Sequence, residues 1–224
     1  MFPNAMKNTL KNAPATSVIA ALCTLVFVVT AVQSRSVMDV IWDSPVGEQM
    51  ILFGPLVYDW GYLRTLSAGF LHLDITHLAL NMFMLVFIGA EVERFVGSGP
   101  FAVAYCAGVL WSSISVLAFN FTTPTAGASG ALYMLMAVLI AVAYRRSTDL
   151  RAPLTLVAVN VVYSLMSPTV SLWGHLGGLV AGAVLGWWLT SPNVRTRWVA
   201  TWSALVAAVP VVWLLTVPST IPVY

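Results

Sequence analysis

Charged side chains are scarce in this chain: only 8% of its 224 residues are Asp, Glu, Lys or Arg, against about 25% in ordinary soluble domains. Hydrophobic residues make up 59% of the chain, and its mean hydropathy is +0.89. So few polar side chains could not cover a water-facing surface, which excludes a soluble globular protein. Disorder is excluded by the same composition, and nucleic-acid binding by a net charge of only +2 without a basic stripe.

Cysteine is equally rare. Cys23 and Cys106 are the only two, and each lies inside a long apolar run. Cysteines in such runs usually behave as small buried hydrophobic residues, so a scaffold held together by disulfides is not expected. The remaining class is an all-α polytopic membrane protein.

Seven apolar stretches are long enough to cross a bilayer, which takes about 17–25 residues. They cover about residues 16–33, 75–96, 100–119, 127–145, 151–167, 171–190 and 198–218. The long link from Ser34 to Leu73 is rich in Trp, Tyr and Asp and is predicted to lie at the membrane interface. We therefore expect three parts: a short tail over 1–15, a six-helix core over 16–190, and a seventh span with a tail over 191–224.

The basic residues indicate how the spans run. Eight of the ten fall on one side of the seven-span arrangement: Lys7, Lys11, Arg94, Arg145, Arg146, Arg151, Arg195 and Arg197. Only Arg35 and Arg64 fall on the other. Because basic residues stay in the cytoplasm, the amino terminus is predicted to be cytoplasmic and the carboxyl terminus outside. We expect a multi-pass protein of the plasma membrane, such as a bacterial inner membrane.

Polar side chains within apolar spans are functional candidates, because hydrocarbon disfavours them. The three histidines, His72, His77 and His175, lie at or near the outer ends of even-numbered spans, and Asn81 follows His77 by one helical turn. Ser129 lies near the start of the fourth span. Counting residues at 1.5 Å of rise places His77, Ser129 and His175 at a common depth of very roughly 5–10 Å.

Small residues surround these candidates. Gly174, Gly178, Gly182 and Gly186 recur every four residues along the sixth span, and Gly127 and Gly130 flank Ser129. Ridges of this kind allow two helix backbones to meet in lipid, although they are common in transporters too. We expect the fourth and sixth spans to approach closely enough for Ser129 and His175 to touch.

The combination favours acyl transfer. The run Gly127-Ala128-Ser129-Gly130 opens a helix, where unpaired N–H groups and the helix dipole favour a developing anion. His175 is the candidate general base for Ser129. His77 and Asn81 are candidate donors to the oxyanion, together with a backbone N–H near Ser129.

No Asp or Glu lies at a matching depth on another even-numbered span to orient His175, so the expected machinery is a Ser–His dyad. Tyr133, one turn after Ser129, is a candidate packing partner for the imidazole. Taken singly, each residue has a plainer explanation. A membrane serine usually bonds to the carbonyl four residues earlier, a lone histidine is usually structural, and a single tyrosine is usually core.

Other functions fit the pattern less well. A zinc site would need His72 and His77, which are five residues apart and so would point in different directions from a helix. No His-Glu-x-x-His motif is present either. No metal or cofactor is therefore predicted. A transporter or channel lined by His and Asn leaves Gly-x-Ser-Gly unexplained and would favour repeated halves. A structural anchor would need no buried polar groups.

These motifs resemble those of the rhomboid intramembrane serine proteases. The likeness runs from about residue 16 to 190. It rests on Gly127-Ala128-Ser129-Gly130, on His72, His77 and Asn81 in a His-x4-His-x3-Asn pattern, on His175, Gly178 and Gly182, on Tyr133, and on Glu93-Arg94 with Gly97. Each motif is loose by itself, whereas all of them in order at matching spans are specific.

The resemblance implies a role for each matching position. Ser129 would be the nucleophile, His175 the base, and His77 and Asn81 the oxyanion donors with the Ser129 backbone. Supporting roles are implied for His72, Tyr133, Gly127 and Gly178, and Arg64 is expected to stabilise the long first loop. The sequence departs from the family at Leu63, where the family often has Trp before the Arg. This difference bears on how the loop is anchored and not on catalysis.

The implied reaction is hydrolysis of a peptide bond in or near the transmembrane helix of a single-span membrane protein, close to the outer boundary. Helix-weakening Gly, Pro or small residues are expected at the cut. The loop Met166–Ser171 and the second and fifth helices are the expected route of entry. The alternative is a catalytically inactive rhomboid-like protein that binds transmembrane clients; such proteins usually lack the Ser or the His, and both are present here.

Overall fold

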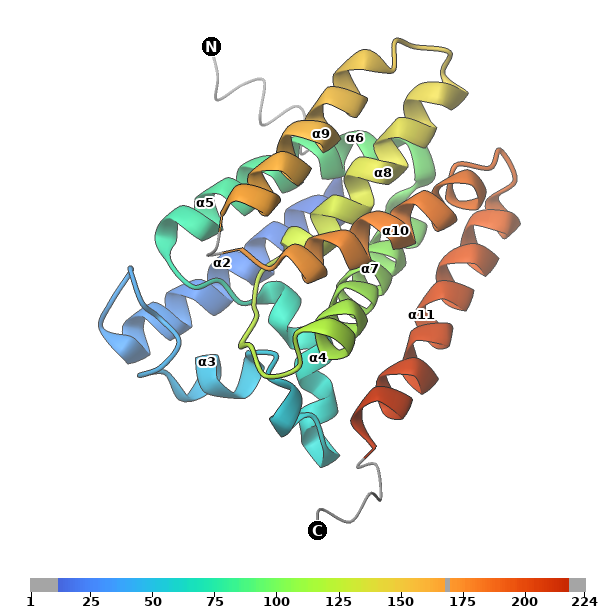
Figure 1. The fold of residues 1–224 in the computed structure, drawn as a ribbon. Coiled ribbons are helices and arrows are strands. Elements are labelled where there is room, and N and C mark those ends of the chain that lie inside the picture. The colour runs from blue at the N-terminus through green and yellow to red at the C-terminus, as the bar shows by residue number, and fades with distance from the viewer. Residues whose placement is uncertain (1–11, 168–169, 218–224) are drawn as a thin grey trace, which may run out of the picture.

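The computed structural model describes residues 12–167 and 170–217. Throughout these ranges the regular elements are helices, packed as a bundle (Figure 1). Some of the predictions lie outside the described residues. These are the basic pair Lys7 and Lys11 in the amino-terminal tail, the centre of the loop 166–171, and the last residues of the carboxyl-terminal tail.

The predicted spans match the long helices to within four residues at each end. The helices are α2 (Pro14–Ser34), α5 (Ile75–Met84) continuing through the π-helical turn η4 (Leu85–Gly89) into α6 (Ala90–Val96), α7 (Ser98–Phe119), α8 (Ser129–Arg145), α9 (Arg151–Met166), α10 (Leu172–Leu189) and α11 (Val194–Thr216). Five of the described spans are long and apolar enough to cross a membrane, whereas α8 and α9 have only 17 and 16 residues. The predicted fold class, an all-helical polytopic membrane protein, is confirmed.

Helix α8 is the centre of the bundle. Almost every side chain in its first half is buried, and it packs against α10, α7, α9 and α6. At 1.5 Å per residue its 17 residues extend about 26 Å, less than the roughly 30 Å of a hydrocarbon core. A central helix this short cannot reach both faces of the hydrocarbon core.

The link between α2 and α5 folds into short helical segments. They are α3 (Pro45–Met50), η1 (Gly54–Leu56), η2 (Asp59–Leu63), α4 (Arg64–Ser67) and η3 (Ala68–Phe70). The Arg64 guanidinium donates to the carbonyls of Glu48 and Ile51, at 2.5 and 3.0 Å, and so ties α4 to the end of α3. Leu63, the departure from the family pattern, is 62% exposed, so this position does not contribute to that contact.

The same link holds the segment that precedes α8. Leu52 and Thr125 form an antiparallel backbone bridge, with N–H to carbonyl distances of 3.0 and 2.8 Å. The Gly127 N–H donates to the carbonyl of Ala68 at 2.9 Å. These bonds join the first loop to the residues leading into Ser129, which fixes where α8 starts.

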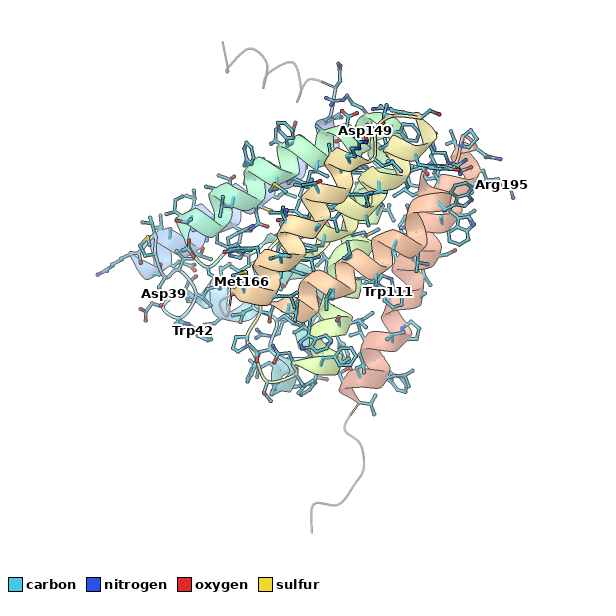
Figure 2. All side chains as sticks on the ribbon, turned by 45° about the horizontal axis from the view of Figure 1, so that its top comes forward. Asp39, Trp42, Trp111, Asp149, Met166 and Arg195 are labelled. Atoms are coloured by element: carbon cyan, nitrogen blue, oxygen red, sulfur yellow. The ribbon has the colours of Figure 1, made fainter. Side chains whose placement is uncertain are left out.

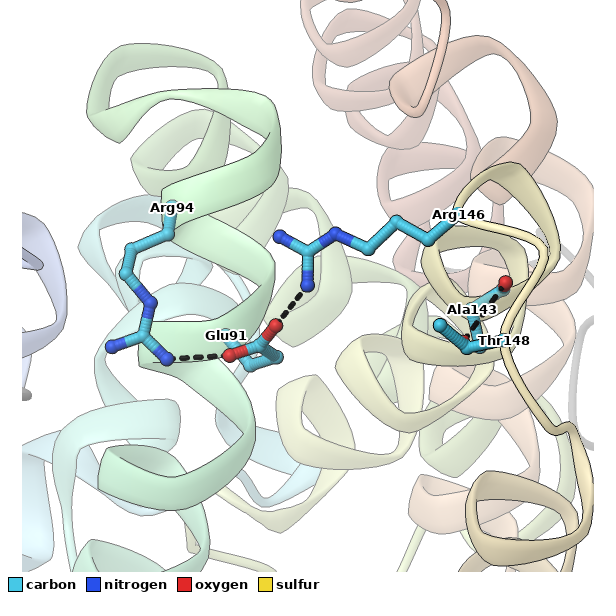
Figure 3. A network of polar contacts seen from close by, with 5 residues as sticks. All are labelled: Glu91, Arg94, Ala143, Arg146 and Thr148. Atoms are coloured by element: carbon cyan, nitrogen blue, oxygen red, sulfur yellow. Dashed lines mark hydrogen bonds and ion pairs between the residues drawn. The ribbon is translucent and has the colours of Figure 1, made fainter.

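Most described arginines gather at one end of the bundle. The Glu91 carboxylate of α6 pairs with both Arg94 and Arg146, bridging α6 to the end of α8 (Figure 3). Arg197 of α11 donates to the last carbonyls of α6 at 3.1 Å. Figure 2 shows Asp149 and Arg195 toward this end, and Asp39, Trp42 and Met166 toward the other.

Helix α11 is attached mainly through α7. The indole N–H of Trp111 in α7 donates to the carbonyl of Ala204 in α11 at 3.0 Å, and the ring of Trp198 lies against Gly99. Figure 1 shows α11 at the edge of the bundle, diverging from α10 toward its carboxyl end. The main packing partners of α8 are α10, α7, α9 and the α5–α6 span, and α11 is not among them.

The amino end of α2 is capped by a buried carboxylate. Glu93 of α6 is 1% exposed and accepts from the Ala15 N–H at 2.9 Å and from the N–H and hydroxyl of Thr16 at 2.7 Å each. No side chain of α2 itself caps this end. A carboxylate at a helix amino terminus satisfies otherwise unpaired N–H groups and complements the helix dipole.

We predict that Glu93→Gln destabilises the protein by about 1.5–3 kcal/mol, because hydrogen bonds to a charged acceptor are lost in a buried site. The measurement is thermal unfolding in detergent micelles. The matched control is Glu91→Gln on the same helix. Its ion pairs are one-third exposed, so they should contribute only about 0–1 kcal/mol. Equal losses in the two variants would contradict the capping role of Glu93.

Candidate active site

The backbone entering α8 has a shape that requires glycine. Gly127 has φ of +130°, a conformation that residues with a Cβ rarely adopt. A Cβ at this position would also lie 2.8 Å from both Cε1 and Nε2 of the His77 ring. Gly127 therefore allows the His77 imidazole to approach the chain immediately before Ser129, which is the first residue of α8.

Helices α8 and α10 meet backbone to backbone. A Cβ on Gly178 would lie 1.9 Å from the carbonyl oxygen of Gly130, and one on Gly182 would lie 2.3 Å from that of Met134. No side chain fits between the helices at these points. The close approach brings the first turn of α10, which carries His175, beside the first turn of α8.

The structure brings Ser129 and His175 into contact. The Ser129 Oγ lies 2.8 Å from His175 Nε2, a hydrogen-bond distance. The imidazole is 6% exposed and stacks on the ring of Tyr133, with centroids 4.2 Å apart and planes 11° apart. The ring stack and the Ser129 contact together hold the imidazole.

The other ring nitrogen of His175 contacts a residue that the sequence analysis did not single out. Ser164 Oγ of α9 lies 2.7 Å from His175 Nδ1. Ser164 is not a carboxylate and lies on an odd-numbered span, so it differs from the Asp or Glu expected to orient such a base. A signal was nevertheless present, because Asn160 and Ser164 form a polar pair four residues apart near the carboxyl end of the apolar fifth span.

His77 and Asn81 lie on α5, whose amino end is capped by Asp74 Oδ1 accepting from the His77 N–H at 2.8 Å. The Leu73 N–H donates to His77 Nδ1 over 3.5 Å. In the neutral ring this leaves the proton on Nε2, the edge that faces Gly127. Asn81 Nδ2 donates to the His77 carbonyl at 2.8 Å, and its buried Oδ1 has no hydrogen-bond partner within residues 12–167 and 170–217.

His72 packs against the His77 ring. Its ring is fully buried and contacts the His77 ring edge-on, with centroids 5.2 Å apart. Burial, together with a smaller effect of the neighbouring His77, lowers the pKa of His72 to about 3, so the ring is neutral at physiological pH. Neither ring nitrogen has a hydrogen-bond partner in the described part of the chain.

A sequence model described as the rhomboid domain matches residues 59–192, which is more than half of the chain. The chain belongs to the rhomboid family. The match begins after α2 and ends just past α10, so it contains the histidines, Ser129 and the glycines of the α8–α10 contact.

Individual rhomboid proteins are similar to it at moderate identity. The chain is 33% identical over 144 residues to the rhomboid protease GluP of Bacillus subtilis, covering 60% of this chain and 28% of that protein. It is 27% identical over 146 residues to human Rhomboid-related protein 3, covering 57% and 35%. It is 28% identical over 167 residues to Rhomboid-like protease 2 of Toxoplasma gondii, covering 69% and 59%. The chain thus spans less than two thirds of each of these relatives.

The backbone contact of α8 with α10 leads to a prediction on the glycine ridge. Gly178→Ala should destabilise this rhomboid by about 1–3 kcal/mol, because the new methyl overlaps a backbone oxygen that cannot move aside. Gly186→Ala is the control, since its Cβ would lie 3.3 Å from the Ala141 methyl, a tight but side-chain contact. Unfolding followed by circular dichroism in detergent compares the two. Similar stabilities for both variants would argue against the close packing described here.

Proposed function

We propose that this rhomboid is an intramembrane serine endopeptidase whose nucleophile is Ser129 and whose general base is His175. The observation that carries the proposal is the 2.8 Å contact between Ser129 Oγ and His175 Nε2. It occurs at a helix amino terminus, inside a membrane-spanning bundle. A serine hydroxyl beside an imidazole nitrogen is the arrangement that activates a serine for acyl transfer.

The reaction follows from these two groups. His175 Nε2 takes the hydroxyl proton as Ser129 Oγ attacks the substrate carbonyl carbon, and the imidazolium then gives that proton to the leaving amine. The carboxyl-terminal product leaves as this amine, and the amino-terminal product stays bound to Ser129 as an ester. Water, deprotonated by the same nitrogen, hydrolyses the ester and restores the free hydroxyl.

The negative oxygen of the tetrahedral intermediate needs donors. The unpaired N–H groups in the first turn of α8 are the backbone contribution. The His77 Nε2–H faces this turn across Gly127, and the second hydrogen on Asn81 Nδ2 is not needed for its bond to the His77 carbonyl. His72, packed against the His77 ring, supports this donor.

The substrates we propose are single-span membrane proteins cut near the outer boundary, where α8 begins. A helix in lipid has all its backbone groups paired, so the scissile bond must unwind before Ser129 can attack it. Gly, Pro or small residues near the cut make this unwinding easier. Entry beside α9 is supported by its sparse packing, since only Pro153 and Ser164 of this helix are buried.

The proposed setting is a plasma membrane with the amino terminus in the cytoplasm. The gathering of arginines at the end of the bundle remote from Ser129 supports this orientation. With it, the first turns of α8 and α10 face the outer leaflet. The alternative is an inactive rhomboid-like protein that binds transmembrane clients. Labelling of the nucleophile distinguishes it from an active protease.

A fluorophosphonate probe should label the wild-type protein in detergent, and Ser129→Ala should abolish both this labelling and the cleavage of a single-span substrate. The reason is that His175 Nε2 lies 2.8 Å from Ser129 Oγ, where it can remove the hydroxyl proton. Ser115→Ala is the matched control, because Ser115 is a half-buried serine of α7 that packs against Gly177 of α10; it should label like the wild type. Equal labelling of wild type and Ser129→Ala would refute the proposed protease.

Asn81→Ala should lower kcat by about 10²–10³-fold with little change in KM, because an oxyanion donor acts mainly in the transition state. Cleavage rates measured over a range of substrate fractions in proteoliposomes separate the two constants. A variant that raised KM alone would place Asn81 in substrate binding instead.

A further inference from the structure

The bond between Ser164 and His175 gives the catalytic base a third partner. We propose that Ser164 is a positioning residue: its hydroxyl oxygen accepts a hydrogen bond from His175 Nδ1–H and thereby keeps Nε2 free of a proton and facing Ser129. This inference rests on the proposed function and deepens it. Ser164 itself touches neither Ser129 nor, by this proposal, the substrate.

The hydrogen-bond partners around Ser164 support one direction for this bond. Ser164 Oγ lies 2.9 Å from the carbonyl oxygen of Asn160, to which it donates, and the Tyr133 hydroxyl donates to the same carbonyl at 2.5 Å. One carbonyl oxygen has two lone pairs and can accept both hydrogens. The Ser164 oxygen then remains an acceptor. Two groups face it, His175 Nδ1 at 2.7 Å and the Tyr133 hydroxyl at 2.5 Å. With the Tyr133 hydrogen directed at the Asn160 carbonyl, the donor to Ser164 is His175 Nδ1–H.

The opposite direction would prevent the chemistry. If Ser164 donated its hydrogen to Nδ1, the neutral imidazole would carry its proton on Nε2. Nε2–H could only donate to Ser129 Oγ, and it could not remove the hydroxyl proton. When Nδ1–H of His175 donates to Ser164, the hydroxyl and imidazole hydrogens of Ser164, Tyr133 and His175 are all paired. Nε2 then carries no proton and can accept one, which is the tautomer that a general base needs.

Ser164 and Tyr133 constrain different motions of the ring. The Tyr133 ring lies flat against the imidazole, with planes 11° apart, and so restricts tilting. It does not select an angle within the plane. The bonds at the two nitrogens, to Ser164 and Ser129, fix that angle because they leave the ring on opposite sides. A neutral hydroxyl thus takes the orienting position that a carboxylate occupies in a Ser-His-Asp triad.

The position of Ser164 within α9 argues against a role in packing alone. Its side chain is 4% exposed, whereas most of α9 faces outward. The apolar side chains of α9 that touch the core, Leu156, Val157 and Val161, lie one to two turns earlier. Docking of α9 can therefore be weakened at those positions without touching the imidazole, which provides a control.

The test measures the tautomer of His175 directly. The chain has only three histidines, so protein labelled with ¹⁵N-histidine and purified on a histidine-free tag gives three imidazole spin systems by NMR in micelles. His72→Gln and His77→Gln assign them. A ring nitrogen without a proton resonates far downfield of one with a proton, so each tautomer is read without any assay of activity.

Four proteins are compared: wild type, Ser164→Ala, Ser164→Thr and Val157→Ala. We expect the wild-type His175 to carry its proton on Nδ1. Ser164→Ala should shift the ring toward the Nε2–H form and lower kcat about three- to tenfold at unchanged KM, the effect of losing one hydrogen bond to a neutral partner. Ser164→Thr, which keeps the hydroxyl, should restore both. Val157→Ala should lower the melting temperature and leave the tautomer unchanged.

Unchanged tautomer and kcat in Ser164→Ala would overturn the inference, and so would the same tautomer shift in Val157→Ala, because the effect would then belong to helix docking. If Ser164→Ala does not fold, Ser164→Cys gives the same contrast, since a thiol is a poor acceptor. A tautomer shift in a protein that neither labels with fluorophosphonate nor cleaves substrate would keep Ser164 as the positioning residue and overturn the proposed protease instead.

Discussion

The direct contact of two helix backbones underlies the whole arrangement. With Gly178 and Gly182 set against the carbonyls of Gly130 and Met134, α8 and α10 approach more closely than side chains would allow. In lipid no hydrophobic effect drives helices together, so small residues that allow dense packing are what holds such a pair. The 2.8 Å contact between Ser129 and His175 is a consequence of this approach, because both residues lie in the first turns of helices whose relative position is already set.

The rest of the fold fixes where those first turns lie. The first loop bonds to the segment before Ser129 through Leu52, Thr125 and Ala68, and Arg64 holds that loop together. At the far end of the bundle, Glu93 caps α2 and Arg197 caps α6. Buried polar groups are costly in hydrocarbon unless paired, so each of these bonds constrains a helix end more strongly than it would in water.

Much of the site could be predicted from the sequence. The depth of His77, Ser129 and His175 follows from counting residues along apolar spans, and the α8–α10 contact follows from glycines repeating every four residues. Ser164 was missed for a definite reason. Orienting groups were sought among carboxylates, and a serine in an odd-numbered span resembles an ordinary packing residue until its rotation about the helix axis is known. The contacts of the first loop were equally hidden, because backbone bonds between distant segments leave no residue pattern.

The sequence by itself determined where the long apolar helices lie, how far along each helix a polar residue stands, and which pair of helices can touch. These properties are one-dimensional, since the bilayer thickness and the rise per residue convert position in the chain into depth. Only the tertiary structure decided which way each side chain faces around its helix. Rotation depends on packing with every neighbour at once, and it is rotation that turns Ser164 toward His175 Nδ1 and the His77 ring toward Gly127.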